Sequence, residues 1–178
     1  DLLIDLNAWD PSAIPAGTRP LDYLRTLAKA QRALVIHGNF LDDEEIAYLA
    51  DHADHMAVVY CPRTHEYFQH APYRLAEMLR AGGAVALGTD SRASNPDLSV
   101  LEEMRSVRRL HPHVSSEDIV RMATLWGAKS LGLSDNFGSL QVGKTANLSV
   151  VTLPEKEDDP HELLWDERTA PRETWIGG

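Results

Sequence analysis

Two apolar runs in this chain each end in a side chain that can bind a metal ion. Residues 84–87 (AVAL) lead into Gly88-Thr89-Asp90-Ser91, and residues 33–36 (ALVI) lead into His37. A carboxylate oxygen and a neutral imidazole nitrogen both suit Zn²⁺ or Fe²⁺. Each also has a structural alternative, because a histidine can be satisfied inside the fold and an aspartate can cap a helix. If both runs are strands of one parallel sheet, their ends share a rim and the two side chains can meet.

Further polar side chains follow the strand candidate at residues 56–60 (MAVVY). Arg63 and Thr64 could face a substrate at the mouth of a barrel, or could form hydrogen bonds within their loop. His65 could contact a substrate or the water on a metal ion, or could be a surface histidine. Cys61 has no identifiable base nearby in the sequence, so we interpret it as a buried structural cysteine.

Two polar residues after Asp90 complete the candidates. Ser91 and Asn95 could orient the aspartate from behind or contact a substrate. They could equally cap the helix that follows them. We carry both residues forward as substrate-binding candidates.

Strands and helices alternate along the chain, which favours an α/β fold with a parallel sheet and right-handed crossovers. Strands are expected at 33–36, 56–60, 84–87, 147–153 and 173–176, and helices at 22–32, from 43 onward, 73–81, 98–110 and 119–128. Residues 1–20 and 62–72 lack a clean period and are expected to be loops.

Four stretches of this chain resemble one enzyme superfamily. They are VIHGNFLDDEEI, VVYCPRTHEYFQH, VALGTDSRASNPDLSVLEEMR and ATLWGAKSLGLSDNFGSLQVGKTANLSVV, within residues 30–152. Together they resemble the C-terminal half of the metal-dependent amidohydrolase superfamily, most closely its cytosine deaminase and triazine chlorohydrolase group. The GTDS and GSLQVGK segments are the most specific parts of this resemblance.

The resemblance implies the C-terminal half of a distorted (β/α)8 TIM barrel, with four barrel strands, followed by strands of a small β-domain. His37 would end the fifth barrel strand as a metal ligand. Asp90 would end the eighth, bind the metal and shuttle the proton of the attacking water. The metal would be zinc, or iron. We place the barrel part at residues 1–135 and the strands of the small domain at 136–178.

The implied activity is metal-dependent hydrolysis of a carbon–nitrogen, non-peptide bond in a small heterocyclic substrate, of the deaminase or chlorohydrolase type. Hydrolysis of cyclic amides on the same fold is the nearest alternative. A non-catalytic barrel remnant that serves as a scaffold is the alternative from another class. His65 and Asp90 would be the catalytic residues.

Three departures from the family pattern qualify this expectation. The family's His-x-His motif on the first strand is absent before His37, and the only such motif, at residues 111–113, lies downstream in a region expected to be a solvated loop. Phe40 stands where many deaminases carry a glutamate, although residues 42–45 (DDEE) supply acids nearby. Tyr60 stands where the family often has a histidine. We therefore expect the first half of the barrel to lie outside these residues, and the fragment alone to be inactive.

Composition narrows the classes of partner. The net charge of the 178 residues is -10, which argues against a nucleic-acid surface and gives no support for binding to anionic membranes. The single cysteine is compatible with a reducing, cytoplasmic location. A small-molecule substrate and the missing N-terminal half of the barrel are the expected partners, and assembly into a homo-oligomer is an open alternative.

Overall fold

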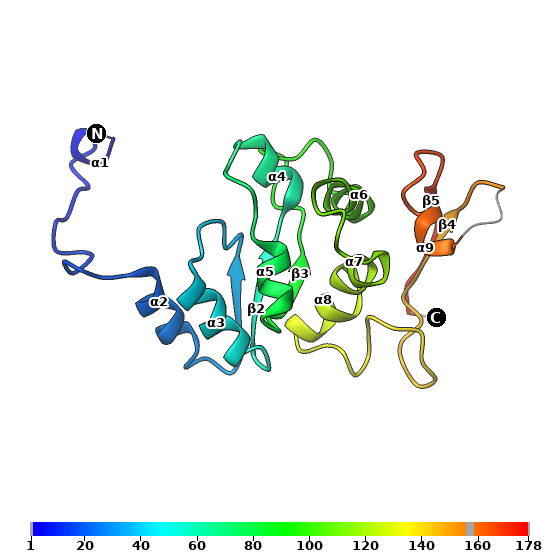
Figure 1. The fold of residues 1–178 in the computed structure, drawn as a ribbon, viewed down its shortest axis with the longest axis horizontal. Helices are drawn as coiled ribbons and strands as arrows, with labels where there is room; N and C mark the ends of the chain where they lie inside the picture. The colour runs from blue at the N-terminus through cyan, green and yellow to red at the C-terminus, as the bar shows by residue number, and fades with distance from the viewer. Residues whose placement is uncertain (1, 156–158, 178) are drawn as a thin grey trace.

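The computed structural model describes residues 2–155 and 159–177. Its centre is a parallel sheet in the order β1-β2-β3, formed by β1 (Ala33–Ile36), β2 (Met56–Tyr60) and β3 (Val85–Leu87) (Figure 1). Val58 pairs with Val85 across β2 and β3, and Val35 pairs with Val58 across β1 and β2. The predicted alternation of strands and helices in a parallel sheet is confirmed.

The described sheet has three strands where four were expected. β2 pairs directly with β3, so no strand lies between them. Residues 71–73, which lie between β2 and β3 in the sequence, contact side chains of other segments instead. The main-chain oxygen of Ala71 accepts a hydrogen bond from His65, and the buried Tyr73 stacks on Tyr60.

One helix precedes the sheet and the others follow its strands, and together they build the core. They are α2 (Pro20–Leu27), α3 (Asp43–Asp51), α4 (Pro62–Tyr67), α5 (Leu75–Arg80), α6 (Val100–Leu110), α7 (Ser116–Ala123) and α8 (Leu125–Ser130). Alternate residues Met56, Val58 and Tyr60 of β2 face these helices, because side chains in a strand alternate between its two faces. Val107 of α6 and Ile119 of α7 are fully buried in this cluster.

Side-chain caps explain where the longer helices begin. The carboxylate of Asp42 accepts a hydrogen bond from the Glu45 main-chain N–H, and the Glu45 carboxylate accepts one from the Asp42 N–H. The hydroxyls of Ser99 and Ser115 accept equivalent bonds at the starts of α6 and α7. These caps satisfy N–H groups that have no partner within the helix.

Three expectations for local structure were wrong. Residues 62–72 contain helix α4, and residues 1–20 contain the short α1 (Leu2–Asp5). The single helix expected over 119–128 is two helices, because the backbone of Thr124 (φ -127°, ψ -92°) leaves the helical region and breaks α7 from α8. Each of these elements is short, and a short helix gives little periodic signal.

The C-terminal segment forms a separate antiparallel pair. β4 (Leu148–Thr152) pairs with β5 (Ala170–Trp175), with an irregularity between Val150 and Val151. The guanidinium group of Arg105 on α6 donates hydrogen bonds to the main-chain oxygens of Asp166 and Thr169, close to α9 (Pro160–Leu163). Both predicted strands are confirmed. The division at residues 135/136 stays a prediction, and residues 156–158 of the acidic stretch lie outside the described residues.

Two apolar side chains stand out near the first strand of the sheet. Within the described residues β1 and β3 each pair only with β2, so each has an unpaired edge. Ile36 at the end of β1 is 52% exposed, and Phe40 just beyond it is 75% exposed.

Among the described residues, none of the helices has the length and apolar character that a membrane-spanning helix requires.

Candidate metal and active site

His37 and Asp90 lie together at the C-terminal ends of β1 and β3. The Nε2 atom of His37 is 3.9 Å from Oδ2 of Asp90, and each side chain is about one-third exposed. Both residues have positive φ angles, 69° and 56°, which are uncommon for residues other than glycine. Backbone conformations of this kind often occur at functional sites, where surrounding contacts hold them in place.

The two donor atoms fit a divalent metal ion. Zinc binds histidine nitrogen and carboxylate oxygen at about 2.0–2.2 Å, so one ion can contact both donors at the observed separation. Two ligands do not complete a tetrahedral site. The part of the chain that the structure describes contains no group of three histidine, cysteine or acidic side chains able to hold a metal. His37 and Asp90 are therefore two of the ligands that a complete site would need.

The backbone at His37 is held from the core side. The hydroxyl of Tyr73 donates a 2.5 Å hydrogen bond to the main-chain oxygen of His37. The next residue, Gly38, has a φ of 58°, and a Cβ there would lie 3.1 Å from both Leu41 and Val58. Tyr73 is buried, and burial raises the pKa of its phenol, so the hydroxyl remains a donor.

Asp90 is held by a chain of hydroxyls and by an amide. The hydroxyl of Ser94 donates to Oδ2 of Asp90 at 3.0 Å and lies 3.0 Å from the hydroxyl of buried Thr64. The side-chain amide of Asn95 donates to the main-chain oxygen of Thr89 at 2.8 Å. The first contact orients the carboxylate, and the second holds the peptide that carries it.

Cys61 lies close to the same segment, next to Gly88 and near Asp90. The thiol is buried, and burial, with the Asp90 carboxylate as a smaller cause, raises its pKa to about 12. A Cβ at Gly88 would lie 2.7 Å from Val59 and 3.2 Å from Cys61, so a larger residue does not fit there.

A buried carboxylate, Glu103, connects this region to α6. Its side chain is fully buried, accepts a 2.6 Å hydrogen bond from the Asn95 amide and accepts a 3.1 Å bond from the main-chain N–H of Arg63. Burial raises its pKa, although the hydrogen bonds from Arg63 and Asn95 oppose the shift. Glu103 therefore differs from its neighbour Glu102, whose side chain is 40% exposed.

The structure gives the predicted substrate-binding residues other partners. The guanidinium of Arg63 binds both carboxylate oxygens of Asp97, at 2.6 and 3.1 Å, and this pairing lowers the pKa of Asp97 to about 2. Thr64 and Asn95 are buried in the contacts described above. Ser91 is exposed, and its hydroxyl accepts a bond from the Ala93 main chain. Arg63, Thr64 and Asn95 therefore bind other protein groups around the site. Ser91 stays a candidate for substrate contact.

His65 is neither a surface histidine nor free to reach a ligand. It is buried, with Nδ1 3.1 Å from Oδ1 of Asn39 and Nε2 2.8 Å from the main-chain oxygen of Ala71. Burial lowers its pKa. Because both ring nitrogens are engaged, the geometry does not favour the predicted catalytic role. His65 instead ties the loop after His37 to α4.

The first histidine of the His-x-His pair at 111–113 is also structural. His111 Nε2 lies 3.2 Å from the hydroxyl of Tyr60, whose ring stacks on Tyr73 at 3.8 Å. Burial lowers the pKa of His111. His111 was expected to be solvated, and it is half-buried instead. The sequence did not reveal this contact, because it joins residues 51 positions apart.

Each of the four acids near Phe40 has a hydrogen-bond or ion-pair partner outside the candidate site. Asp42 and Glu45 bond each other's main chain in the cap of α3. Asp43 pairs with Arg74, and Glu44 pairs with Arg19. These acids therefore do not replace the glutamate that Phe40 displaces.

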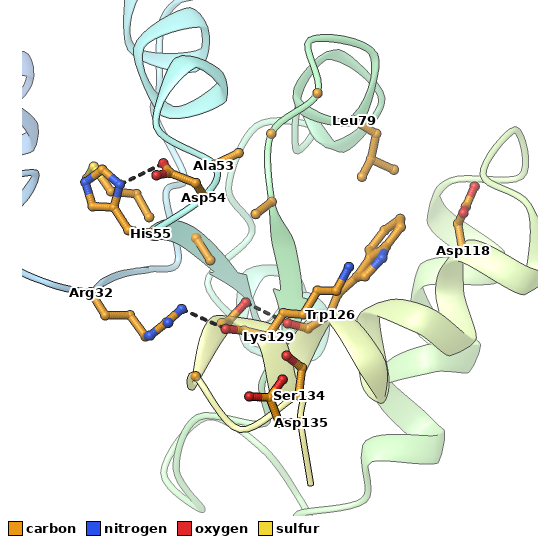
Figure 2. A pocket seen from close by; sticks show the side chains of 17 residues that line it. Arg32, Ala53, Asp54, His55, Leu79, Asp118, Trp126, Lys129, Ser134 and Asp135 are labelled. Carbon is orange, nitrogen blue, oxygen red and sulfur yellow. Dashed lines mark hydrogen bonds and ion pairs between the residues drawn. The ribbon is translucent and has the colours of Figure 1, made fainter. Parts of the chain in front are cut away.

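A cavity of about 840 Å³ lies at the opposite end of the sheet (Figure 2). Arg32, Met56 and Ala84, which stand at or just before the starts of the strands, help to line it, together with Trp126 and Lys129 of α8. The Arg32 guanidinium donates to the Lys129 main-chain oxygen and bridges the two sides. The cavity is thus separate from the end of the sheet that holds His37 and Asp90.

The comparisons with known proteins agree with this architecture. The model of the amidohydrolase family matches residues 14–178, and the chain belongs to that family. The 5-methylthioadenosine/S-adenosylhomocysteine deaminase of Pelotomaculum thermopropionicum is 37% identical over 157 residues, which cover 83% of this chain and 36% of that protein.

Two solved structures show the same fold. An adenosine deaminase from Xanthomonas campestris with bound zinc is 32% identical with a TM-score of 0.79, over 92% of this chain and 40% of its own. An atrazine chlorohydrolase variant from Arthrobacter aurescens, complexed with zinc and atraton, is 26% identical with a TM-score of 0.73, over 92% and 39%. The chain spans about a third of the length of the curated relatives that it matches. In one of them the matched region is 33% of the whole protein.

Proposed function

We propose that this chain is the C-terminal part of a metal-dependent hydrolase that cleaves a carbon–nitrogen bond in a small heterocyclic substrate. The observation that carries the proposal is the pair His37 and Asp90, whose donor atoms are 3.9 Å apart at the ends of two strands of an amidohydrolase-type sheet. Among the alternatives, deamination is favoured by the names of the related deaminases.

His37 and Asp90 would hold the metal ion, with zinc favoured over iron because both zinc-containing neighbours share this fold. When bound, a divalent metal lowers the pKa of water and polarises the bond under attack. Asp90 would accept the proton of the attacking water and return it to the leaving group. Ser94 keeps the Asp90 carboxylate oriented for this transfer.

The remaining parts of the site would come from the first half of the barrel. The described residues supply two ligands and no free acid at the position of Phe40. The unpaired edges of β1 and β3 are where further barrel strands would pair. We infer that the active enzyme contains an N-terminal half that supplies the other ligands and protonates the heterocycle.

The chlorohydrolase alternative rests on a specific observation. Many deaminases of this group carry a glutamate where this chain has Phe40, and the neighbouring acids are committed to helix α3 and its ion pairs. A chloride leaving group needs no proton, so it depends less on such an acid. The atrazine chlorohydrolase neighbour fits this alternative.

Metal analysis and substrate turnover of the intact gene product test the proposal. We expect about one equivalent of zinc or iron, release of ammonia from adenine nucleosides, and loss of turnover of at least ~10³-fold in Asp90→Asn. Asp54→Asn, which alters an exposed acid at the other end of the sheet, is the matched control and should leave turnover unchanged. Chloride release from a chlorotriazine without ammonia release would assign the chlorohydrolase activity instead.

The scaffold alternative gives a different result. A full-length protein that contains no stoichiometric metal, and in which Asp90→Asn changes neither turnover nor metal content, would contradict the enzymatic proposal. Turnover of cyclic imides in place of nucleosides and triazines would retain the enzyme and change its substrate class.

A further inference from the structure

We infer that Glu103 is a positioning residue that aims Asp90 at the metal site through Asn95. This inference rests on the proposed function, because it concerns how tightly the site binds its metal. It also goes further, because it assigns a role to a buried carboxylate on α6 that touches neither proposed ligand.

The Thr89–Asp90 peptide is held by the side chain of Asn95. Its oxygen accepts a 2.8 Å hydrogen bond from the Asn95 amide. Asp90 has a φ of 56°, which a residue with a side chain adopts only at a cost. The bond from Asn95 therefore restrains the peptide plane that sets the direction of the Asp90 carboxylate.

Asn95 is itself held by the carboxylate of Glu103. Its Nδ2 atom donates to Glu103 at 2.6 Å as well as to Thr89, so both donors of the amide are used. Asn95 is 2% exposed and Glu103 is 0% exposed, so water does not compete for these bonds. The carboxylate of Glu103 accordingly fixes which way the Asn95 amide faces.

Glu103 is in turn held by Arg63. Its second oxygen accepts a 3.1 Å bond from the main-chain N–H of Arg63, at the start of α4. The Arg63 guanidinium lies 3.7 Å from the first oxygen and compensates the buried charge. Glu103 therefore ties together the end of β2, the turn after β3 and helix α6, three segments that surround Asp90.

Glu103→Gln tests this chain of contacts at nearly constant volume. In a glutamine one of the two oxygen positions becomes an NH2 group, so the side chain cannot accept from Asn95 at one position and from the Arg63 N–H at the other. We expect the affinity of the intact protein for zinc, measured by competition with a chelator, to fall by about 10–100-fold, as is usual when support for a metal ligand is lost. Glu102→Gln, on the neighbouring and more exposed position of α6, is the matched control and should leave zinc affinity unchanged.

Asn95→Ala provides a second test, because a buried charge change at Glu103 could prevent folding. It removes the link to Thr89 and leaves the bond between Glu103 and Arg63 in place. We expect a similar loss of zinc affinity, and a double variant no weaker than the weaker single one, because both changes break the same link. Circular dichroism of each variant establishes that it is folded when its affinity is measured.

The outcomes separate this inference from the proposed function. If wild-type protein binds no stoichiometric metal, the proposed function fails, whatever Glu103 does. If wild-type protein binds zinc and folded Glu103→Gln or Asn95→Ala binds it equally tightly, the proposed function stands and the positioning role of Glu103 is wrong. A loss of unfolding free energy with unchanged zinc affinity would assign Glu103 a purely structural role.

Discussion

Cys61 is the single cysteine of the chain and lies near the proposed metal ligand Asp90, yet its surroundings suppress its reactivity. The side chain is 2% exposed, and burial raises its pKa to about 12. The nearby Asp90 carboxylate disfavours a thiolate further. Since the thiolate is the nucleophile, we interpret Cys61 as a buried packing residue and not as a reactive group.

Alkylation measures this protection directly. At pH 8 we expect Cys61 in folded protein to react with iodoacetamide at least ~100-fold more slowly than in protein unfolded by urea, because an ordinary cysteine has a pKa of about 8.5. Mass spectrometry of the peptide that contains Cys61 follows the reaction, and the urea-unfolded sample is the control. Equal rates in the two states would show that the thiol is accessible in the fold.

The residues that end the strands were easier to predict from sequence than those that support them. His37 and Asp90 follow apolar runs, and a parallel sheet places strand ends at one edge. Glu102 and Glu103, in contrast, are adjacent and chemically identical, yet only Glu103 is fully buried. The helical periodicity does not tell which of the two glutamates is buried. A buried carboxylate is recognised by its hydrogen-bond partners, and those of Glu103 lie 8 and 40 residues away.

At the scale of elements, the N-terminus of α3 explains why the acids near His37 do not serve the site. Asp42 and Glu45 form a reciprocal cap, with both hydrogen bonds at 2.9 Å. The cap also fixes where the helix starts after the loop that carries Phe40. Four acids in sequence were read as possible proton donors, and the structure uses two of them to begin a helix.

Asp42→Ala tests the strength of this cap. We expect the free energy of unfolding to fall by about 0.5–2 kcal/mol, because two main-chain N–H groups at the start of α3 lose or weaken their partners. Asp42→Ser keeps a side-chain acceptor and should recover most of the loss. Urea unfolding followed by circular dichroism measures both variants. An alanine variant as stable as the wild type would mean that solvent replaces the cap.

Helix α4 and the break after α7 show why some elements escaped prediction. Residues 62–67 (PRTHEY) have no apolar period, and α4 forms because Pro62 and Thr64 are buried and the Glu103 carboxylate accepts the N–H of Arg63. The break at Thr124 follows an uninterrupted helical pattern in sequence. A tertiary contact therefore supports α4, and local propensity reports neither this contact nor the break at Thr124.

At the scale of the whole molecule, the described sheet is incomplete. β1 and β3 each have an edge without a partner strand, and Ile36 at the end of β1 is 52% exposed. Unpaired edges with apolar neighbours are templates for pairing with another chain. The region that matches the curated relatives is only about a third of their length, 33% in one case. This fits a sheet that other barrel strands complete.

A polypeptide of residues 1–178 produced by itself should therefore self-associate. We expect sedimentation velocity to show a weight-average mass that rises with concentration, because the edges of β1 and β3 and the exposed Phe40 offer surfaces for another copy. Ile36→Lys places a charge at the end of β1 and should reduce association. Leu140→Lys changes an even more exposed apolar residue, 84% exposed in the loop before β4, and should not reduce association. A polypeptide that sediments as a monomer at every concentration would show that the sheet tolerates its free edges, and association reduced equally by both substitutions would place the contact elsewhere.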